Sequence, residues 1–205
     1  MTRSFLLMLL ATAIYGVVHS FLAADTVKAA VERRTGRGAF RFYRLFYNLV
    51  ASAAIAPLWL ALTRFPDAPL YSIPFPQKVF FFALQAAAAA GLVASVAQTG
   101  VLSFLGIAQL SRPGAAKEEK TALVKTGLFR LVRHPAYSCG IAMLWLSPAM
   151  TVNLLALNAG LSAYMIVGAF IEERRLVVEL GDEYRDYRRR TPMFVPGMNL
   201  LRGVR

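Results

Sequence analysis

Residues 129–150 read "FRLVRHPAYSCGIAMLWLSPAM", with two arginines, a histidine and a proline directly before an apolar run. Because proline fixes φ and lacks an N–H, Pro135 suits the first position of a helix and biases His134 toward an extended conformation. The unpaired N–H groups and positive dipole end of that helix, beside Arg130 and Arg133, attract a carboxylate or phosphate. Arginines at a membrane surface also contact lipid headgroups, so this stretch alone leaves both interpretations open.

The composition places the chain in a membrane. Of its 205 residues 57% are hydrophobic and only 17% are charged, with a mean hydropathy of +0.50, which is too apolar for an ordinary soluble domain. The net charge of +12 could suggest nucleic acid, but membrane proteins concentrate basic residues in cytoplasmic loops. The single cysteine, Cys139, excludes an internal disulfide and a Cys-x-x-Cys metal site. We therefore expect a lipid environment, no nucleic-acid partner and no metal.

Two apolar segments lie in the first third of the chain. Residues 4–24 are uncharged and reach about 32 Å as a helix, enough to span a bilayer. The stretch also has features of a signal peptide, but it is long for one and we interpret it as an anchor. A second span is expected over residues 45–63, kinked at Pro57, and the proline-rich residues 65–76 read as an irregular loop.

A third apolar pattern covers residues 79–110, which is longer than a bilayer needs and predicts a bend near Gly100. Within it Ala87 and Gly91 are small residues one turn apart, a spacing that lets helices approach closely in lipid. Residues 135–171 then predict two short helices, with a turn near Thr151 to Asn153, or alternatively at Asn158 and Gly160.

The positions of lysine and arginine test this set of spans. Twenty of the 23 fall in the connections 25–44 and 111–134 or in the carboxyl-terminal tail, as five spans with an outside amino terminus require. The sequence therefore predicts an all-α integral membrane bundle of about five transmembrane helices in one domain, residues 1–205, with three spans in 1–110. The basic connections and the tail share the cytoplasmic face.

A second polar cluster follows the last span. Glu172 and Glu173 oppose the dipole of that helix and are costly at depth, so they need a cationic partner or a function. If the hairpin closes, they return to the side of Arg133 and His134. Beyond them an amphipathic pattern predicts a carboxyl-terminal cytoplasmic helix that is either a lid over the bundle or an interfacial helix; its apolar face carries Leu176, Leu180, Tyr184 and Tyr187.

These two clusters resemble a known superfamily. "GLFRLVRHPAY" (127–137), followed after a short hydrophobic hairpin by "EERRLVVELGDEYRDYRRRTPMFVP" (172–196), is similar to the signature of isoprenylcysteine carboxyl methyltransferases and related phospholipid and thiol methyltransferases of membranes. The amino-terminal "YGVVHSFLAADTVK" and "YRLFYN" more loosely resemble methanethiol methyltransferases and NnrU-like proteins of bacteria. The family often has a glycine two residues after the box tyrosine, where this chain has Cys139.

The resemblance implies S-adenosylmethionine bound in a cavity open to the cytosol, in a multi-pass protein of the bacterial inner membrane whose residues 111–205 form the cofactor-binding region. It implies that Arg133, His134 and Tyr137, with Glu172 and Glu173, hold the cofactor or order its site. Further cofactor-binding candidates are Gln109 in "FLGIAQL", Gly127, Val132, Pro135, Tyr184 and Tyr187.

Methyl transfer from a sulfonium requires alignment and a dry site more than acid–base machinery. Aromatic rings such as Tyr137 and Tyr187 would hold the sulfonium by cation–π contact. A carboxylate acceptor needs no base, whereas a thiol or amine must lose a proton, and Glu173 and His134 are then the catalytic candidates. The acceptor is expected to be apolar or membrane-partitioned: an isoprenylcysteine-like carboxylate, a small thiol or a lipid amine. The charge asymmetry and the shortness of the last two helices favour its lateral entry from the bilayer.

Three alternatives remain at this stage. Membrane sterol reductases share a similar carboxyl-terminal region, but they are about twice as long. The two histidines, His19 and His134, could ligate a haem in a non-enzymatic NnrU-like accessory protein, or the chain could be a family member that has lost catalysis. Dinucleotide, zinc-protease and serine-hydrolase motifs are absent from the sequence, so those chemistries have no support.

Overall fold

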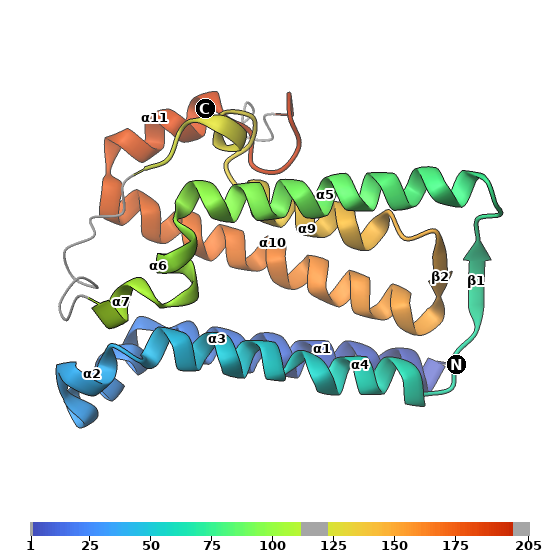
Figure 1. Cartoon of the computed structure of the whole chain (residues 1–205), viewed down its shortest axis with the longest axis horizontal. Coiled ribbons are helices and arrows are strands. Elements are labelled where there is room, and N and C mark those ends of the chain that lie inside the picture. The colour runs from blue at the N-terminus through green and yellow to red at the C-terminus, as the bar shows by residue number, and fades with distance from the viewer. Residues whose placement is uncertain (1, 112–122, 199–205) are drawn as a thin grey trace. The chain divides into compact units, whose positions relative to one another are not determined.

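The chain is nearly all helical, as the sequence predicts (Figure 1). The computed structural model describes residues 2–111 and 123–198. The helices of its first part are α1 (Thr2–Ala23), α2 (Asp25–Phe40), α3 (Tyr43–Ala53), α4 (Ile55–Arg64), α5 (Gln77–Thr99), α6 (Val101–Leu105) and α7 (Ala108–Ser111). After residue 122 follow the 3-10 turn η1 (Gly127–Arg130), α9 (Pro135–Trp145), α10 (Val152–Leu180) and α11 (Asp182–Arg190). Two short strands, β1 (Pro69–Ser72) and β2 (Ala149–Thr151), pair with each other.

Four helical stretches in the described residues are long and apolar enough to cross a membrane: α1, the α3–α4 pair, α5 and α10. Their large apolar side chains are mostly exposed, for example Val17 at 68%, Trp59 at 67% and Val93 at 64%. Such exposure is costly in water and favourable against lipid tails. The chain is therefore a multi-pass membrane protein.

Two predicted interruptions occur for the expected reasons. The break between α3 and α4 falls at Ala54. It is caused by Pro57, whose ring clashes with the carbonyl four residues earlier and whose nitrogen has no hydrogen to donate to that carbonyl. The long third pattern breaks at Gly100, whose φ of +94° is a conformation that only glycine adopts without strain.

The described chain divides into two compact units. Of the described residues, the first unit contains 2–68, 100–111 and 151–160, and the second contains 69–99, 123–150 and 161–198. In the first unit α1 packs against α4, and a Cβ on Gly160 would lie 2.8 Å from Thr12 Cγ2. The expectation of a single domain stays a prediction.

The second unit is built on the contact between α5 and α9. A Cβ added to Gly91 would lie 2.8 Å from Cys139 Sγ, so the small residue predicted for close packing makes room for the cysteine that replaces the family's glycine. The thiol of Cys139 thus belongs to this helix contact.

One end of the second unit carries the strand pair. Ile73 N donates to Pro148 O at 2.8 Å, and Tyr71 Oη donates to Ser147 O at 3.1 Å. The other end of α5 meets η1, where Leu128 N donates to Gln98 Oε1 at 3.2 Å. Residues 127–150 therefore run the length of α5 and return the chain to the end where α5 begins.

The structure confirms the expected turn and corrects two other expectations. The turn falls at Thr151, as predicted, and the competing site, Asn158 and Gly160, lies inside α10. That helix is not short: it has 29 residues, because the Glu, Arg and Leu residues after Ile171 are good helix formers and extend it beyond the apolar run. The proline-rich loop 65–76 includes β1 and is not wholly irregular.

The predicted fifth span, α9, has 11 residues, about 17 Å of helix. It ends before Ser147 because Pro148 disfavours the helical conformation of the preceding residue. Leu146 continues the last turn with φ −81° and ψ 13°, and only Ala149–Thr151 of the following residues form a strand. Because α9 alone is shorter than a bilayer core, the fifth span stays a prediction.

Candidate functional site

The amino end of α9 begins as the sequence predicts. Pro135 occupies the first turn, and His134 is the residue before the helix, with φ −122° and ψ 63°. Val132, Arg133 and His134 are 5%, 5% and 7% exposed. Arg133 and His134 are therefore buried in the protein, whereas Arg130 is exposed.

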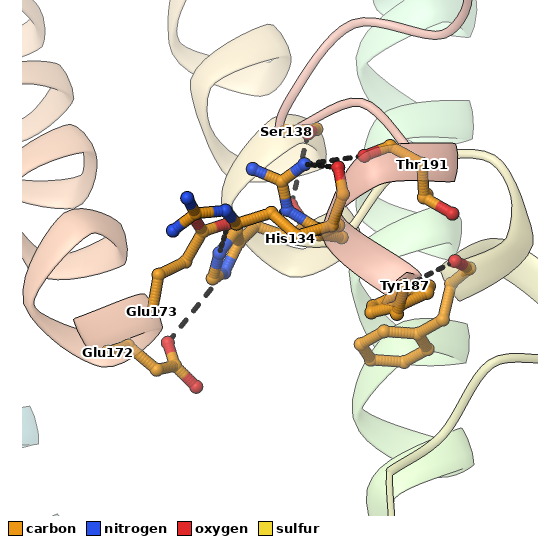
Figure 2. A network of polar contacts seen from close by, with 9 residues as sticks. His134, Ser138, Glu172, Glu173, Tyr187 and Thr191 are labelled. Carbon is orange, nitrogen blue, oxygen red and sulfur yellow. Dashed lines mark hydrogen bonds and ion pairs between the residues drawn. The ribbon is translucent and has the colours of Figure 1, made fainter. Parts of the chain in front are cut away.

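A buried ion pair joins this point to α10 (Figure 2). Arg133 Nε donates to Glu173 Oε1 at 2.6 Å, and the two side chains are 2% and 6% exposed. The predicted return of the acidic cluster to Arg133 and His134 is thus observed. Because both charges are buried, each depends on the other for its stability.

The imidazole of His134 lies between two carboxylates. Its Nε2 is 3.2 Å from Glu173 Oε1, and its Nδ1 is 3.8 Å from Glu172 Oε2. Glu173 is almost fully enclosed, whereas the side chain of Glu172 is 39% exposed. A proton on either ring nitrogen therefore faces an acceptor, and only Glu172 among these groups reaches solvent.

Residues 191–198, here called the carboxyl-terminal strap, cross the start of α9. Arg133 N donates to Pro192 O at 2.9 Å and His134 N to Met193 O at 3.1 Å. The Arg133 guanidinium donates through Nη1 to Arg188 O at 3.0 Å and to Thr191 O at 2.5 Å. The N–H groups of Arg133 and His134, which on sequence grounds are candidates for binding an anion, therefore donate to backbone carbonyls at the end of α11 and in the strap.

Aromatic rings surround the histidine. Tyr137 stacks on His134 with ring centroids 5.6 Å apart and planes inclined by 18°. Phe194, from the strap, approaches the same imidazole at 5.9 Å and 40°. The strap is fixed there because Ser138 Oγ donates to Phe194 O at 2.7 Å.

The two predicted tyrosines of α11 lie inside the protein. Tyr184 and Tyr187 are 1% and 7% exposed, and Tyr187 Oη donates to Phe129 O at 2.6 Å. Burial raises the pKa of Tyr187 to about 12, and Glu173 adds to the increase while Arg133 opposes it. The predicted carboxyl-terminal amphipathic helix is present as α11, with both tyrosines on its buried face. Leu176 and Leu180, predicted for the same helix, belong to α10, because Gly181 at φ +57° separates the two helices.

The remaining predicted residues fall in two places. Gly127 has φ +58°, and a Cβ there would lie 2.5 Å from Gln98 Nε2, so glycine is required at the contact of η1 with α5. Gln109 belongs to the first unit, where its Nε2 donates to Ser103 O at 3.3 Å. His19 also belongs to the first unit, and its Nε2 lies 2.7 Å from Tyr47 Oη.

Sequence reasoning missed three contributors: Ser138, the carbonyls of the strap, and Phe194. Ser138 and Phe194 could have been suspected, since they lie in or beside the two boxes. Backbone carbonyls carry no signal in a sequence.

Three features define the chemistry of this arrangement. Arg133 and Glu173 form a buried ion pair whose charges neutralise each other. Aromatic rings lie beside His134, and the carboxylate of Glu172 is accessible to solvent. Aromatic faces with a carboxylate suit a small cation. The carboxylate and imidazole also suit proton transfer.

Comparison with known proteins places these residues in context. The model of a family described as NnrU protein matches residues 7–204. Methanethiol S-methyltransferase 1 of Bradyrhizobium diazoefficiens is 29% identical over 192 residues, 92% of this chain and 65% of that protein. Methanethiol S-methyltransferase of Crocosphaera subtropica is 30% identical over 188 residues, 89% of this chain and 71% of that protein.

A further relative matches a shorter part of the chain at higher sequence identity. Methanethiol S-methyltransferase 2 of Bradyrhizobium diazoefficiens is 44% identical over 69 residues, 34% of this chain and 27% of that protein. The chain thus spans 65% of the length of the first of these relatives. No solved structure matches the chain. Both groups that the amino-terminal boxes resemble, NnrU-like proteins and methanethiol methyltransferases, are among the matches, so the resemblance is confirmed.

Proposed function

We propose that this chain, which belongs to the NnrU family, transfers a methyl group from S-adenosylmethionine to a small apolar thiol. One observation carries the proposal: residues 40 positions apart, Arg133 and Glu173, meet in a buried pair that joins the two boxes resembling membrane methyltransferases. Relatives that align over most of the chain are named methanethiol S-methyltransferases, which favours a thiol over a carboxylate or a lipid amine.

The residues around His134 fit a cationic donor. The rings of Tyr137 and Phe194 flank the imidazole, and cation–π contacts of this kind contribute about 0.5 to 2 kcal/mol each. Glu172 adds an accessible carboxylate at 3.8 Å from the histidine. When bound, the donor would supply a methyl group activated by its attachment to a sulfonium.

The imidazole of His134 and the carboxylate of Glu172 accept the proton that the thiol loses. Glu173 is a poorer base, because its Oε1 already accepts from both Arg133 Nε and His134 Nε2 and the side chain is almost fully enclosed. We assign Glu173 the task of holding the imidazole, and His134 with Glu172 the task of accepting the proton. A dry surrounding makes the thiolate more reactive once the proton has left, since it lacks the water that would stabilise its charge.

The length of α10 bears on how the acceptor enters. The sequence favours lateral entry from the bilayer partly because it predicts two short helices. Since α10 has 29 residues, it gives no support to that argument. Charge asymmetry and the 11-residue α9 remain as its support. A small thiol such as methanethiol partitions into lipid without any dedicated opening, so lateral entry is kept in the proposal.

The test is methyl transfer by the purified protein in lipid nanodiscs. The protein receives methyl-labelled S-adenosylmethionine with methanethiol, a farnesylcysteine analogue or phosphatidylethanolamine in separate reactions. We expect label in dimethyl sulfide alone. Label in the prenylated or lipid product would replace the acceptor, and no transfer to any of them, with no binding of S-adenosylhomocysteine in calorimetry, would refute the proposal.

A matched pair of variants tests the roles within the site. Glu172→Gln should lower turnover with methanethiol at neutral pH and lower it less as the pH rises and more thiol ionises by itself. Glu179→Gln, on an exposed ion pair with Arg175 one to two turns further along α10, should leave turnover unchanged. Equal turnover in the two variants at all pH values would remove Glu172 from proton transfer.

A further inference from the structure

We infer that Arg133 is a positioning residue that fastens the carboxyl-terminal strap across the start of α9 and thereby places Phe194 beside His134. This inference rests on the proposed donor site, since it concerns how that site is assembled. The resemblance implies that Arg133 either holds the cofactor or orders its site, and the inference chooses the second role and names the segment that Arg133 orders.

The partners observed for the Arg133 guanidinium all belong to the protein. Its Nε serves Glu173, and its Nη1 serves two carbonyl oxygens, those of Arg188 and Thr191. With 2% of the side chain exposed, little of it is available to a ligand. A planar fork that holds a carboxylate and two carbonyls at once is specific to arginine.

The two carbonyls mark where the strap begins. Arg188 belongs to the last turn of α11, and Thr191 is the residue after that helix. Helix carbonyls in the last turn lack partners within the helix, so Arg133 satisfies them and fixes the exit direction of the chain. The backbone bonds from Arg133 and His134 to Pro192 and Met193 then continue the attachment.

The attachment ends at Phe194, which is the residue that matters for the site. Ser138 Oγ donates to its carbonyl from the first turn of α9, and its ring lies against His134, with the ring centroids 5.9 Å apart. Arg133 and Ser138 therefore hold the strap on either side of the histidine. Loosening either one should free the Phe194 ring and weaken donor binding although the side chains of His134, Glu172 and Glu173 are themselves unaltered.

Two variants separate positioning from direct contact. Arg133→Lys keeps a cation near Glu173 but cannot span the carboxylate and both carbonyls. Ser138→Ala removes the strap contact to Phe194 O, together with a bond to His134 O at 3.0 Å within the first turn of α9, and leaves the arginine intact. The control is Ser147→Ala, which removes a similar bond from a serine to a carbonyl, Ala149 O at 2.7 Å, just beyond the other end of α9.

The first readout is hydrogen exchange of the Arg133 and His134 amides in donor-free protein, because these N–H groups bond to the strap. Losing one hydrogen bond should speed their exchange by about threefold to tenfold in Ser138→Ala, and at least as much in Arg133→Lys. The control should leave it unchanged. Unchanged exchange in both strap variants would overturn the inference whatever the protein's activity.

The second readout is affinity for S-adenosylhomocysteine and the split between KM and kcat. Both strap variants should weaken binding and raise the donor KM by a similar factor, with kcat at saturation nearly retained. If Arg133→Lys weakens binding while Ser138→Ala loosens the strap and leaves affinity intact, Arg133 contacts the donor directly and the inference is wrong. Absence of binding by the unaltered protein refutes the proposed function instead, and the exchange result still decides whether Arg133 holds the strap.

Discussion

At the scale of the residue, the charge on Glu173 holds the site together. Glu173→Gln leaves the buried Arg133 cation without its counter-charge, and breaking such a pair costs about 3 to 5 kcal/mol. We expect a large fall in the thermal unfolding temperature in detergent and loss of S-adenosylhomocysteine binding in calorimetry. Wild-type stability together with normal binding would show that the pair is dispensable.

The matched control for that loss is Glu179→Gln. Its partner Arg175 lies 3.4 Å away, but both side chains are nearly half exposed, and exposed pairs contribute about 0 to 1 kcal/mol. The difference between the two glutamates, on the same helix and with the same substitution, isolates the effect of burial.

A second residue-scale prediction concerns Tyr187. Its raised pKa of about 12 means that the folded state favours the protonated phenol, so its contribution is complete below pH 10 and is lost as the pH rises toward 12. Tyr187→Phe removes the hydrogen bond to Phe129 O, at a cost of about 1 to 3 kcal/mol because the carbonyl loses its partner. Urea unfolding at neutral and alkaline pH should show a deficit at neutral pH that shrinks above pH 10.

At the scale of the element, α5 and α9 depend on a complementary pair. Gly91→Ala places a methyl group 2.8 Å from Cys139 Sγ, closer than van der Waals contact allows, so it should destabilise the protein by about 1 to 3 kcal/mol. Cys139→Gly makes room for that methyl, and the double variant should recover most of the loss in a double-mutant cycle of thermal unfolding. Additive losses would mean that the two helices are not in contact at this point.

The start of α10 depends on Asp67. Partial burial tends to raise the pKa of its carboxyl, but the hydrogen bonds from Thr151 and from the Asn153, Ala68 and Val152 amides outweigh burial, and the pKa is lowered. A lowered pKa stabilises the fold above the unfolded value near 4, and this contribution disappears as the pH falls through the folded value.

Asp67→Ala should therefore cost on the order of 1 kcal/mol at pH 7, as loss of a helix cap does, and the difference from the unaltered protein should close below about pH 4. Asp186→Ala, at an exposed site in α11, is the control. Thermal unfolding at pH 3 to 7 decides the matter, and a deficit independent of pH would show that the charge of Asp67 has no part in the effect.

The helices themselves were predictable where the cause is local. Pro57, Gly100 and Pro135 each act through their own backbone, and each break or start lies where the sequence put it. The extent of α10 was underestimated because an apolar run ends at Ile171 although the helix does not. The charges of Arg133 and Glu173 indicated that each needs a partner. The strap is held by backbone carbonyls, which every residue has, so nothing in the sequence predicted it.

At the scale of the whole molecule, the question is whether the chain crosses the bilayer at α9. In the second unit β2 pairs with β1 at the end where α5 begins, and η1 meets the other end of α5 at Gln98. Since α5 is 23 residues long, about 35 Å, we predict that residues 127–150 return across the same thickness. Such a crossing would be part helix and part extended chain, which lipid tolerates only where the backbone is satisfied, and β1 would supply that pairing.

Five crossings put the amino terminus outside and the basic connections and tail inside. Single cysteines introduced into a Cys139→Ser background and treated with an impermeant maleimide in intact cells test this directly. Ser72→Cys and Ala149→Cys, on the paired strands, should be labelled from outside, whereas Thr35→Cys in α2 and Asp186→Cys in α11 should react only after the membrane is opened. Protection of Ala149→Cys alongside labelling of Ser72→Cys would contradict both the fifth crossing and the strand pairing, because paired strands must share one side of the membrane.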